Sequence, residues 1–228
     1  MLPPGSTIGI LGGGQLGRMM ALAAAPLGLR VHVYAPEDES PAAEVAARHT
    51  RGGYDDRPAL AAFAASVDAI TYEFENVPAA CAALLAGLKP VRPGPKALEV
   101  AQDRLTEKDF VRALGIGTAP YAAAATAEEA RAAFAALGAR TAIVKTRRLG
   151  YDGKGQARVG SPEEAAAAVA AFAAPCILEG LVAFRQEISV VAARGADGRI
   201  EAYDPVENRH REGILRETLA PARLGAGA

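Results

Sequence analysis

The sequence has few residues that could build a metal centre and no segment that could cross a membrane. Its 228 residues include two cysteines and three histidines. Cys81 and Cys176 lie far apart along the chain and lack the spacing of metal ligands, so we predict no zinc cluster. The longest apolar run is far shorter than the roughly 18–20 residues of a membrane span, and no charged N-terminal segment precedes a long apolar core. We expect a soluble cytoplasmic protein.

The chain also lacks an excess of charge of either sign. Lysine and arginine together number 25, aspartate and glutamate 26, and the net charge is −1. A nucleic-acid coat or a membrane-surface protein usually needs a basic excess, so neither class is expected. Repeats of 20–50 residues and Gly/Ser-rich or Pro-rich linkers are absent as well. Local clusters of cations are therefore interpreted as sites.

The first half alternates strands and helices. Strands are predicted over residues 7–11, 30–35 and 68–74, with a helix that ends near Gly28 and another at about 57–65. Leu16, Met19, Met20 and Ala23 share one face of the first helix. Strand, helix, strand with short connections is typical of a doubly wound parallel sheet.

The second half has a different pattern, after a proline-rich loop and a helix at about 104–114. Thr126 and Glu129 form a capping-box pattern, and Ser161 with the proline after it begins another helix. Between these helices, TAIVKT and GKGQARVG predict a hairpin with residues 145–156 at its turn. CILEGLV, RQEISVVAAR and RIEAYDPVE predict further strands, the last two joined at GADG, and so an α+β region.

The segment Gly12-x-Gly14-x-x-Gly17 follows a strand and opens a helix, which suits anion binding at a helix N-terminus. A dinucleotide site would also need an acid after the second strand, where Glu37 lies. Either a dinucleotide, another phosphate or simple packing explains this motif. Nearby, Glu73 and Glu75 are two residues apart, so we expect both to lie on one side of a strand end, facing a ligand or solvent.

The densest group of charges is KTRRLGYDGKGQ, residues 145–156, with four cations and three glycines. Lys145 ends an apolar strand, and the glycines permit a turn that folds over a polyphosphate; a solvated basic hairpin is the alternative. No Gly-Lys-Ser/Thr opens a helix here, so it is not a P-loop. Glu179 and Glu187 are expected on one neighbouring sheet, bracketing a nucleotide.

Five segments, in order, resemble the ATP-grasp superfamily and, within it, the N5-carboxyaminoimidazole ribonucleotide synthetases: GQLGRMM, TYEFENVP, QDRLTEKDF, GYDGKGQ and YDPVENRHREGILRETLAPA. The resemblance runs from residue 8 to about 222. It implies an α/β chain with a Rossmann-like doubly wound domain (1–103), an ATP-grasp α+β lid (104–183) and the start of the ATP-grasp C-terminal subdomain (184–228).

The same resemblance implies an activity and its partners. Such ligases use ATP and bicarbonate to form carboxyphosphate, and the amine of aminoimidazole ribonucleotide captures the carboxyl group in purine biosynthesis. It further implies Mg²⁺ as a cofactor and homodimers, with no nucleic-acid or membrane partner.

The site residues implied by the resemblance fall into two groups. ATP contacts are implied for Arg104, Lys145, Gly150, Tyr151, Asp152, Gly153, Lys154, Gly155, Gln156, Glu179, Gly180, Leu181, Val182, Glu187 and His210. Lys145 and Lys154 are expected to be catalytic by neutralising the triphosphate and carboxyphosphate. Ribonucleotide contacts are implied for Gly14, Gln15, Leu16, Glu73, Tyr151 and Asp152, with the glycines on the 5′-phosphate.

In the family the Mg²⁺ carboxylates lie beyond the LAPA segment, so no metal ligand is predicted in this chain. We therefore expect an N-terminal fragment that keeps ligand-contacting surfaces and lacks turnover. Three alternatives remain: another ATP-grasp ligase of purine synthesis, a nicotinamide-dependent dehydrogenase built on the Gly12–Gly17 motif, and a non-catalytic binding fragment.

Overall fold

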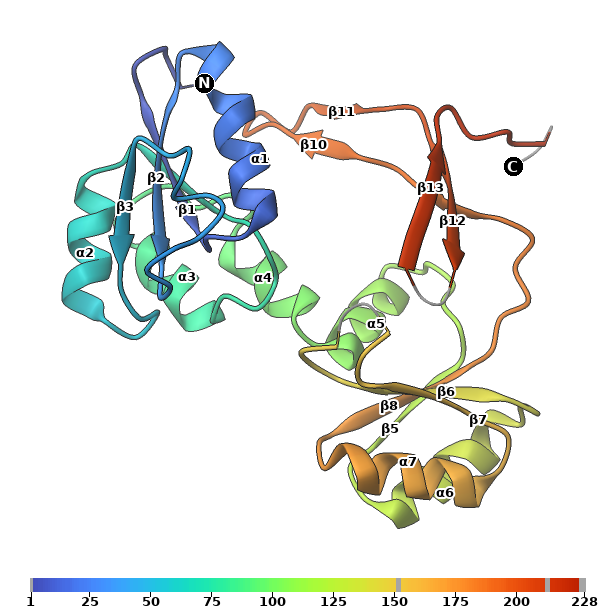
Figure 1. Cartoon of the computed structure of the whole chain (residues 1–228). Coiled ribbons are helices and arrows are strands. Elements are labelled where there is room, and N and C mark those ends of the chain that lie inside the picture. Colours follow the sequence, from blue (N-terminus) through green and yellow to red (C-terminus); the bar gives the residue numbers. More distant parts are fainter. Residues whose placement is uncertain (1, 151–152, 212–213, 226–228) are drawn as a thin grey trace. The chain divides into compact units, whose positions relative to one another are not determined.

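The structure, a computed structural model, describes residues 2–150, 153–211 and 214–225. The chain divides into two compact units, residues 1–116 and 117–228 (Figure 1). The predicted α/β fold with a doubly wound N-terminal sheet is confirmed. The finer division, with borders after residues 103 and 183, stays a prediction. Among the described residues no helix is long and apolar enough to cross a membrane.

Unit 1 is built on a four-stranded sheet in the order β3-β2-β1-β4, with every neighbouring pair parallel. Its strands are β1 (Thr7–Leu11), β2 (Arg30–Ala35), β3 (Arg48–Arg51) and β4 (Ala69–Tyr72). β1 and β2 are largely buried, as expected where helices cover both faces of a parallel sheet.

Helices cover both faces of this sheet (Figure 1). They are α1 (Gln15–Ala24) with the short 3-10 turn η1 (Ala25–Leu27), α2 (Arg57–Ala65), α3 (Ala79–Ala86) and α4 (Pro95–Ala101). The next helix, α5 (Arg104–Ala113), follows α4 along the chain and has no buried residue. α1 packs through one core, with Ile10 and Val33, and α2, α3 and α4 share a larger core around Phe63. η1 ends at Gly28, whose positive φ of 71° confirms the predicted helix stop.

The face of α1 that meets the sheet is made of small residues. Gly17, Ala21 and Ala24 are buried, whereas Leu16 and Met19, on the predicted apolar face, are 57% and 58% exposed. Small side chains let a helix approach a sheet closely, so the larger apolar face of α1 points away from the core.

Glu73 supplies the cap that α1 lacks in its own sequence. Gly14, at the N-cap, has no side chain, and the backbone N–H groups of Gly14 and Gly17 each donate to the Glu73 carboxylate at 2.6 Å. A carboxylate at this end also suits the helix dipole. β4 ends at Tyr72, so Glu73 and Glu75 lie beyond the strand, and the prediction that both project from one side of it is wrong.

Unit 2 begins with a four-stranded sheet in the order β5-β8-β6-β7, with every pair antiparallel. Its strands are β5 (Tyr121–Ala124), β6 (Ala142–Thr146), β7 (Gln156–Val159) and β8 (Cys176–Gly180). The helices α6 (Ala127–Leu137) and α7 (Pro162–Phe172) pack on one face of this sheet (Figure 1). Both begin as predicted: Thr126 and Glu129 form a complete capping box, and the Ser161 side chain caps α7.

The remaining strands form two small sheets. β9 (Glu187–Ser189), β12 (Val206–Arg211) and β13 (Ile214–Leu219) form one in the order β13-β12-β9, and β10 (Ala192–Arg194) pairs with β11 (Ile200–Ala202) through the predicted GADG turn. The two long strands predicted here are therefore each interrupted. Glu187 lies on a different sheet from Glu179, which corrects the expectation that they share one.

One buried histidine links three elements of unit 1. His32 on β2 is 1% exposed, and its ring nitrogens lie 2.8 Å from the hydroxyls of Ser66 and Thr50. Its ring also meets Phe63 edge-on at 4.9 Å. Burial, helped by the charges of Arg48 and His49, lowers the pKa of His32 from 6.5 to about 4. These contacts give His32 a structural role in packing β2 against α2 and β3.

The low pKa of His32 makes stability depend on pH. Between pH 6.5 and about 4, His32 is protonated in the unfolded chain but stays neutral in the folded chain. The free energy of unfolding therefore decreases as the pH falls through this range. This residue should account for a loss of about 3 kcal/mol at most across that range. We expect His32→Gln to flatten this part of the curve in urea unfolding followed by circular dichroism, while His210→Gln does not. Identical slopes for His32→Gln and the wild type would contradict the assignment.

The Glu73 cap should be measurable in the same assay. Glu73→Gln removes the charge and turns an amide donor toward two backbone donors, so we expect the free energy of unfolding to fall by about 2 kcal/mol. Glu75→Gln is the matched control, because Glu75 is exposed and no hydrogen bond of its side chain is seen in the described residues. Equal effects of the two substitutions would show that the contacts with Gly14 and Gly17 do not stabilise the unit.

Candidate functional site

A cavity of about 260 Å³ opens among the loops that follow β1, β2, β3 and β4. This is the carboxyl edge of a parallel sheet, where such sheets bind ligands. The described lining residues are Gly12, Gly13, Gly14, Glu37, Glu39, Ser40, Pro41, Tyr54, Glu73 and Phe74. Three of these carry carboxylates and none is lysine or arginine, so the cavity favours groups that donate hydrogen bonds.

The glycine loop is held closely against its neighbours. Gly12 has a positive φ of 102°, and a Cβ at Gly13 would clash with the Ser40 hydroxyl. The N–H of Ala42 donates to the Gly13 carbonyl at 2.9 Å. The loop therefore needs glycine for packing as well as for any approach of a ligand.

Glu73 occupies the position at the α1 N-terminus where an anion was expected. Since its carboxylate already accepts from Gly14 and Gly17, a phosphate on these amides would have to displace it. Gln15 and Leu16 lie in the first turn of the same helix, and both are exposed. Gly14 and Glu73 line the cavity, and Gln15 and Leu16 follow Gly14 in sequence. Contact of these four residues with a ribonucleotide stays a prediction.

Tyr54, Ser40 and Glu39 were not predicted from the sequence, although all three line the cavity. Burial raises the pKa of the Tyr54 hydroxyl, and the Glu37 and Glu73 carboxylates raise it further, so it stays a neutral donor. The Gly52-Gly53 pair before Tyr54 was the available signal, because it marks the turn between β3 and α2.

In unit 2, the sheet face opposite the helices carries polar groups. Val144 and Leu178 point into the core with α6 and α7, so Lys145 and Glu179 lie on the other face by strand alternation. The Lys145 Nζ lies 3.1 Å from the Glu179 Oε2, and these side chains are only 26% and 12% exposed. A partly buried cation held by one acid is poised to exchange that acid for a more strongly charged ligand.

The glycine-rich turn begins beside this pair. The N–H of Thr146 donates to the Gly155 carbonyl at 2.8 Å, and Gly153 and Gly155 have φ of 77° and 67°. Gln156 pairs with Lys145 across the hairpin. The described members of the turn thus include Gly150, Gly153, exposed Lys154 and Gly155; Tyr151 and Asp152 lie outside the described residues.

The segment after β8 follows the acid directly. Gly180 donates its N–H to the Pro120 carbonyl at 2.8 Å, and Leu181 donates to Thr141 at 3.2 Å. Leu181 and Val182 are each half exposed. These bonds anchor the backbone and leave two apolar side chains available to contact a flat ring.

A second acid and a histidine meet on the sheet of β9, β12 and β13. Glu187 Oε2 lies 3.3 Å from His210 Nδ1, and both side chains remain partly exposed. Glu187 and His210, which the resemblance separately implied as ATP contacts, thus lie side by side. Arg104 is the first residue of α5, and it interacts with at least one other residue. Among the described residues no group of three or more His, Cys, Asp or Glu is placed to hold a metal.

Two family models match the chain in succession. The ribonucleotide synthetase preATP-grasp domain matches residues 5–102, and the ATP-grasp domain matches residues 109–227. The second match alone covers more than half of the chain and includes Lys145, Glu179, Glu187 and His210.

Several similar proteins are named N5-carboxyaminoimidazole ribonucleotide synthase or synthetase. The N5-carboxyaminoimidazole ribonucleotide synthase of Brucella melitensis is 51% identical over 226 residues, which are 98% of this chain and 62% of that protein. The Staphylococcus aureus N5-carboxyaminoimidazole synthetase, complexed with ADP, superposes with a TM-score of 0.91 at 37% identity, over 98% of this chain and 60% of that one.

A third similar structure is the Aspergillus clavatus enzyme in complex with ADP and 5-aminoimidazole ribonucleotide. Its TM-score is 0.85 at 27% identity, over 98% of this chain and 59% of that one. The chain thus spans about three fifths of the length of these relatives. The resemblance inferred from the five sequence segments is confirmed, and the chain belongs to the ATP-grasp family.

Proposed function

We propose that this chain serves the ATP-dependent carboxylation of 5-aminoimidazole ribonucleotide by bicarbonate, which forms N5-carboxyaminoimidazole ribonucleotide in purine biosynthesis. The observation that carries the proposal is the partly buried Lys145–Glu179 pair at the base of a glycine-rich hairpin. The relatives bound to ADP, and to ADP with the ribonucleotide, support the choice of ligands.

ATP binds along the open face of the unit 2 sheet in this proposal. Lys145 exchanges Glu179 for phosphate oxygens, which carry more negative charge, and residues 150–156 fold over the triphosphate with Lys154. Glu179, Gly180, Leu181 and Val182 bind the adenine side, and Glu187 with His210 binds the ribose side. The phosphate contact of Arg104 stays a prediction.

The reaction requires charge neutralisation more than covalent chemistry. A bicarbonate oxygen attacks the γ-phosphorus and ADP leaves, giving carboxyphosphate. The ribonucleotide amine then attacks the carboxyl carbon, inorganic phosphate leaves, and the amine loses a proton. Lys145 and Lys154 offset the charge that builds on the transferring group. Mg²⁺ would supply further neutralisation when bound, and no described residue is proposed to hold it.

The ribonucleotide is proposed to bind in the unit 1 cavity with Glu73. Gly14 and Gly17 hold this carboxylate in place, so its remaining lone pairs can accept from an amine or a ribose hydroxyl. Gln15 and Leu16 complete the contacts from α1, and the ribonucleotide contacts of Tyr151 and Asp152 stay predictions. The three acids of the lining make this cavity better suited to hydrogen-bond donors than to a phosphate, and the 5′-phosphate contact of the glycines stays a prediction. A homodimer also stays a prediction.

The hydrogen bonds from Gly14 and Gly17 to Glu73 also weaken the dehydrogenase alternative. A dinucleotide pyrophosphate would need the amides at the α1 N-terminus, and Glu73 already accepts from those of Gly14 and Gly17. A pyrophosphate could bind these amides only after the Glu73 carboxylate had left them.

Ligand-induced stabilisation tests the proposal on the chain as it is. Melting midpoints are measured with ATP, with aminoimidazole ribonucleotide and with NAD, each alone. A ligand at ~100 times its dissociation constant adds about 2.7 kcal/mol, which shifts the midpoint visibly. We expect shifts with ATP and the ribonucleotide and none with NAD. A shift with NAD alone, or with none of the three, would count against the proposed function.

Lys145→Gln tests whether Lys145 contributes to ATP binding without affecting the rest of the chain. It removes the cation that meets the phosphates, so we expect ATP to bind at least about tenfold more weakly in calorimetric titration, while the ribonucleotide binds unchanged. Arg140→Gln, an exposed cation just before β6, is the matched control. Unchanged ATP affinity in Lys145→Gln would exclude Lys145 from the phosphate site.

A further inference from the structure

Backbone pairing and contacts between polar side chains join the strands β9, β12 and β13. A shift of register by one residue moves every side chain of a strand to the other face of its sheet. Polar contacts between neighbouring strands therefore help to specify which side chains share a face.

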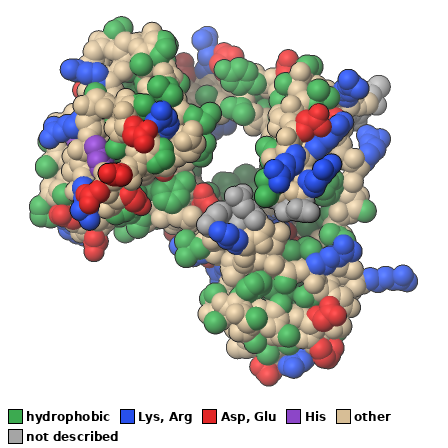
Figure 2. Space-filling model, in the orientation of Figure 1, with side chains coloured by type: hydrophobic (Ala, Val, Ile, Leu, Met, Phe, Trp, Pro, Cys, Tyr) green, Lys and Arg blue, Asp and Glu red, His purple; other side chains and the backbone are tan. Residues whose placement is uncertain are grey.

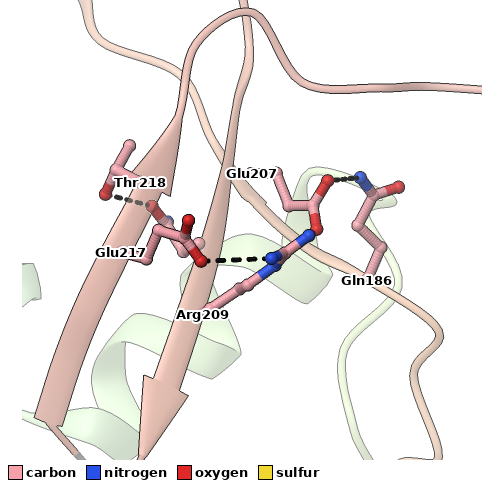
Figure 3. A network of polar contacts seen from close by, with 6 residues as sticks. Gln186, Glu207, Arg209, Glu217 and Thr218 are labelled. Atoms are coloured by element: carbon pink, nitrogen blue, oxygen red, sulfur yellow. Dashed lines mark hydrogen bonds and ion pairs between the residues drawn. The ribbon is translucent and has the colours of Figure 1, made fainter.

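One face of the sheet carries a chain of four polar side chains, which runs from the residue before β9 to β12 and β13 (Figure 3). Gln186, next to β9, donates to Glu207 on β12 at 2.8 Å. The other oxygen of Glu207 accepts from the Nε of Arg209 at 3.2 Å, and the guanidinium reaches Glu217 on β13 at 3.1 Å. Arg209 is thus bound along its own strand and across to the next.

Glu207 and Glu217 stabilise the positive charge of Arg209. The hydrogen bond to Glu207, followed by the charge of Glu217, raises the pKa of the guanidinium. Glu207 is only 16% exposed, whereas Arg209 and Glu217 are 59% and 58% exposed. Arginine side chains gather over this hairpin (Figure 2), so the two acids also offset local repulsion.

The opposite face carries the proposed ribose contacts. Gln186 directly precedes Glu187, and Arg209 directly precedes His210, so strand alternation places Glu187 and His210 on the other face. There they meet at 3.3 Å. Each member of this pair is therefore tied, through its neighbour in sequence, to the network on the first face.

The regular pairing of β12 with β13 ends at Arg209. Glu207, Asn208 and Arg209 face Leu219, Thr218 and Glu217, and after the bulge His210 faces Leu215. A slip of one residue at this point would turn side chains of β13 to the wrong face. The contact from Arg209 to Glu217 lies at the last regular pair, where it opposes such a slip.

We propose that Arg209 is a positioning residue for the nucleotide site: it fixes the register of β12 so that Glu187 and His210 face the ribose. The inference rests on the proposed ATP site and adds a residue that does not touch the ligand.

Calorimetric titration of ATP and of 2′,3′-dideoxy-ATP tests this. The dideoxy nucleotide lacks the hydroxyls that Glu187 would accept, so the wild type should bind it more weakly than ATP. Arg209→Gln should weaken ATP binding on the order of fivefold and leave dideoxy-ATP binding unchanged. Arg209→Lys, which keeps the charge and one partner, should restore part of the loss, and Glu217→Gln should reproduce it.

Arg211→Gln is the matched control, an exposed arginine on the same strand. Absence of ATP binding by the wild type would refute the proposed ATP site itself. Wild-type binding that does not distinguish the two nucleotides, or equal losses of both in Arg209→Gln, would overturn the positioning role. If Arg209→Gln does not fold, the same comparison in Glu217→Gln decides.

Discussion

The carboxylate of Glu73 is the contact on which the arrangement of unit 1 depends. It follows β4, yet it accepts from Gly14 and Gly17 at the start of α1, so it joins two loops at the carboxyl edge of the sheet. A buried helix end without partners is costly, and glycine at the N-cap offers no side chain of its own. The acid therefore explains how a glycine loop can be rigid here and why its amides need no external anion.

In both units the residues that pack in the core and the residues of the candidate site lie at different places on the sheet. In the unit 2 sheet Val144 and Leu178 pack against helices, and the residues beside them, Lys145 and Glu179, form the ion pair on the other face. In unit 1 the polar groups instead follow the ends of the parallel strands, because both faces are covered. Each arrangement holds functional side chains on rigid elements at little cost to the core.

Local signals were sufficient for most elements. The capping box at Thr126, the helix stop at Gly28 and the hairpin around residues 145–156 follow from short-range rules. The site residues came largely from the family resemblance. Tyr54 was missed because β3 is a short edge strand, RHTR, without apolar alternation. The clamp of Glu73 joins positions 59 and 56 residues apart, and no periodicity in the sequence marks such a contact. For the same reason α1 was expected to use its large apolar face, whereas the close approach of its small residues is a tertiary property.

The small sheet of β9, β12 and β13 shows how contacts between polar side chains can specify strand register. Exposed ion pairs add little to stability singly, about 0–1 kcal/mol, but their geometry still distinguishes one register from the next. In the observed pairing Arg209 contacts Glu207 on its own strand and Glu217 on the next strand together. Loss of that contact would lower the free energy of unfolding only slightly. It would still disturb the positions of His210 and Glu187, which meet on the opposite face. A defect in ligand binding without a matching loss of stability is the mark of such a residue.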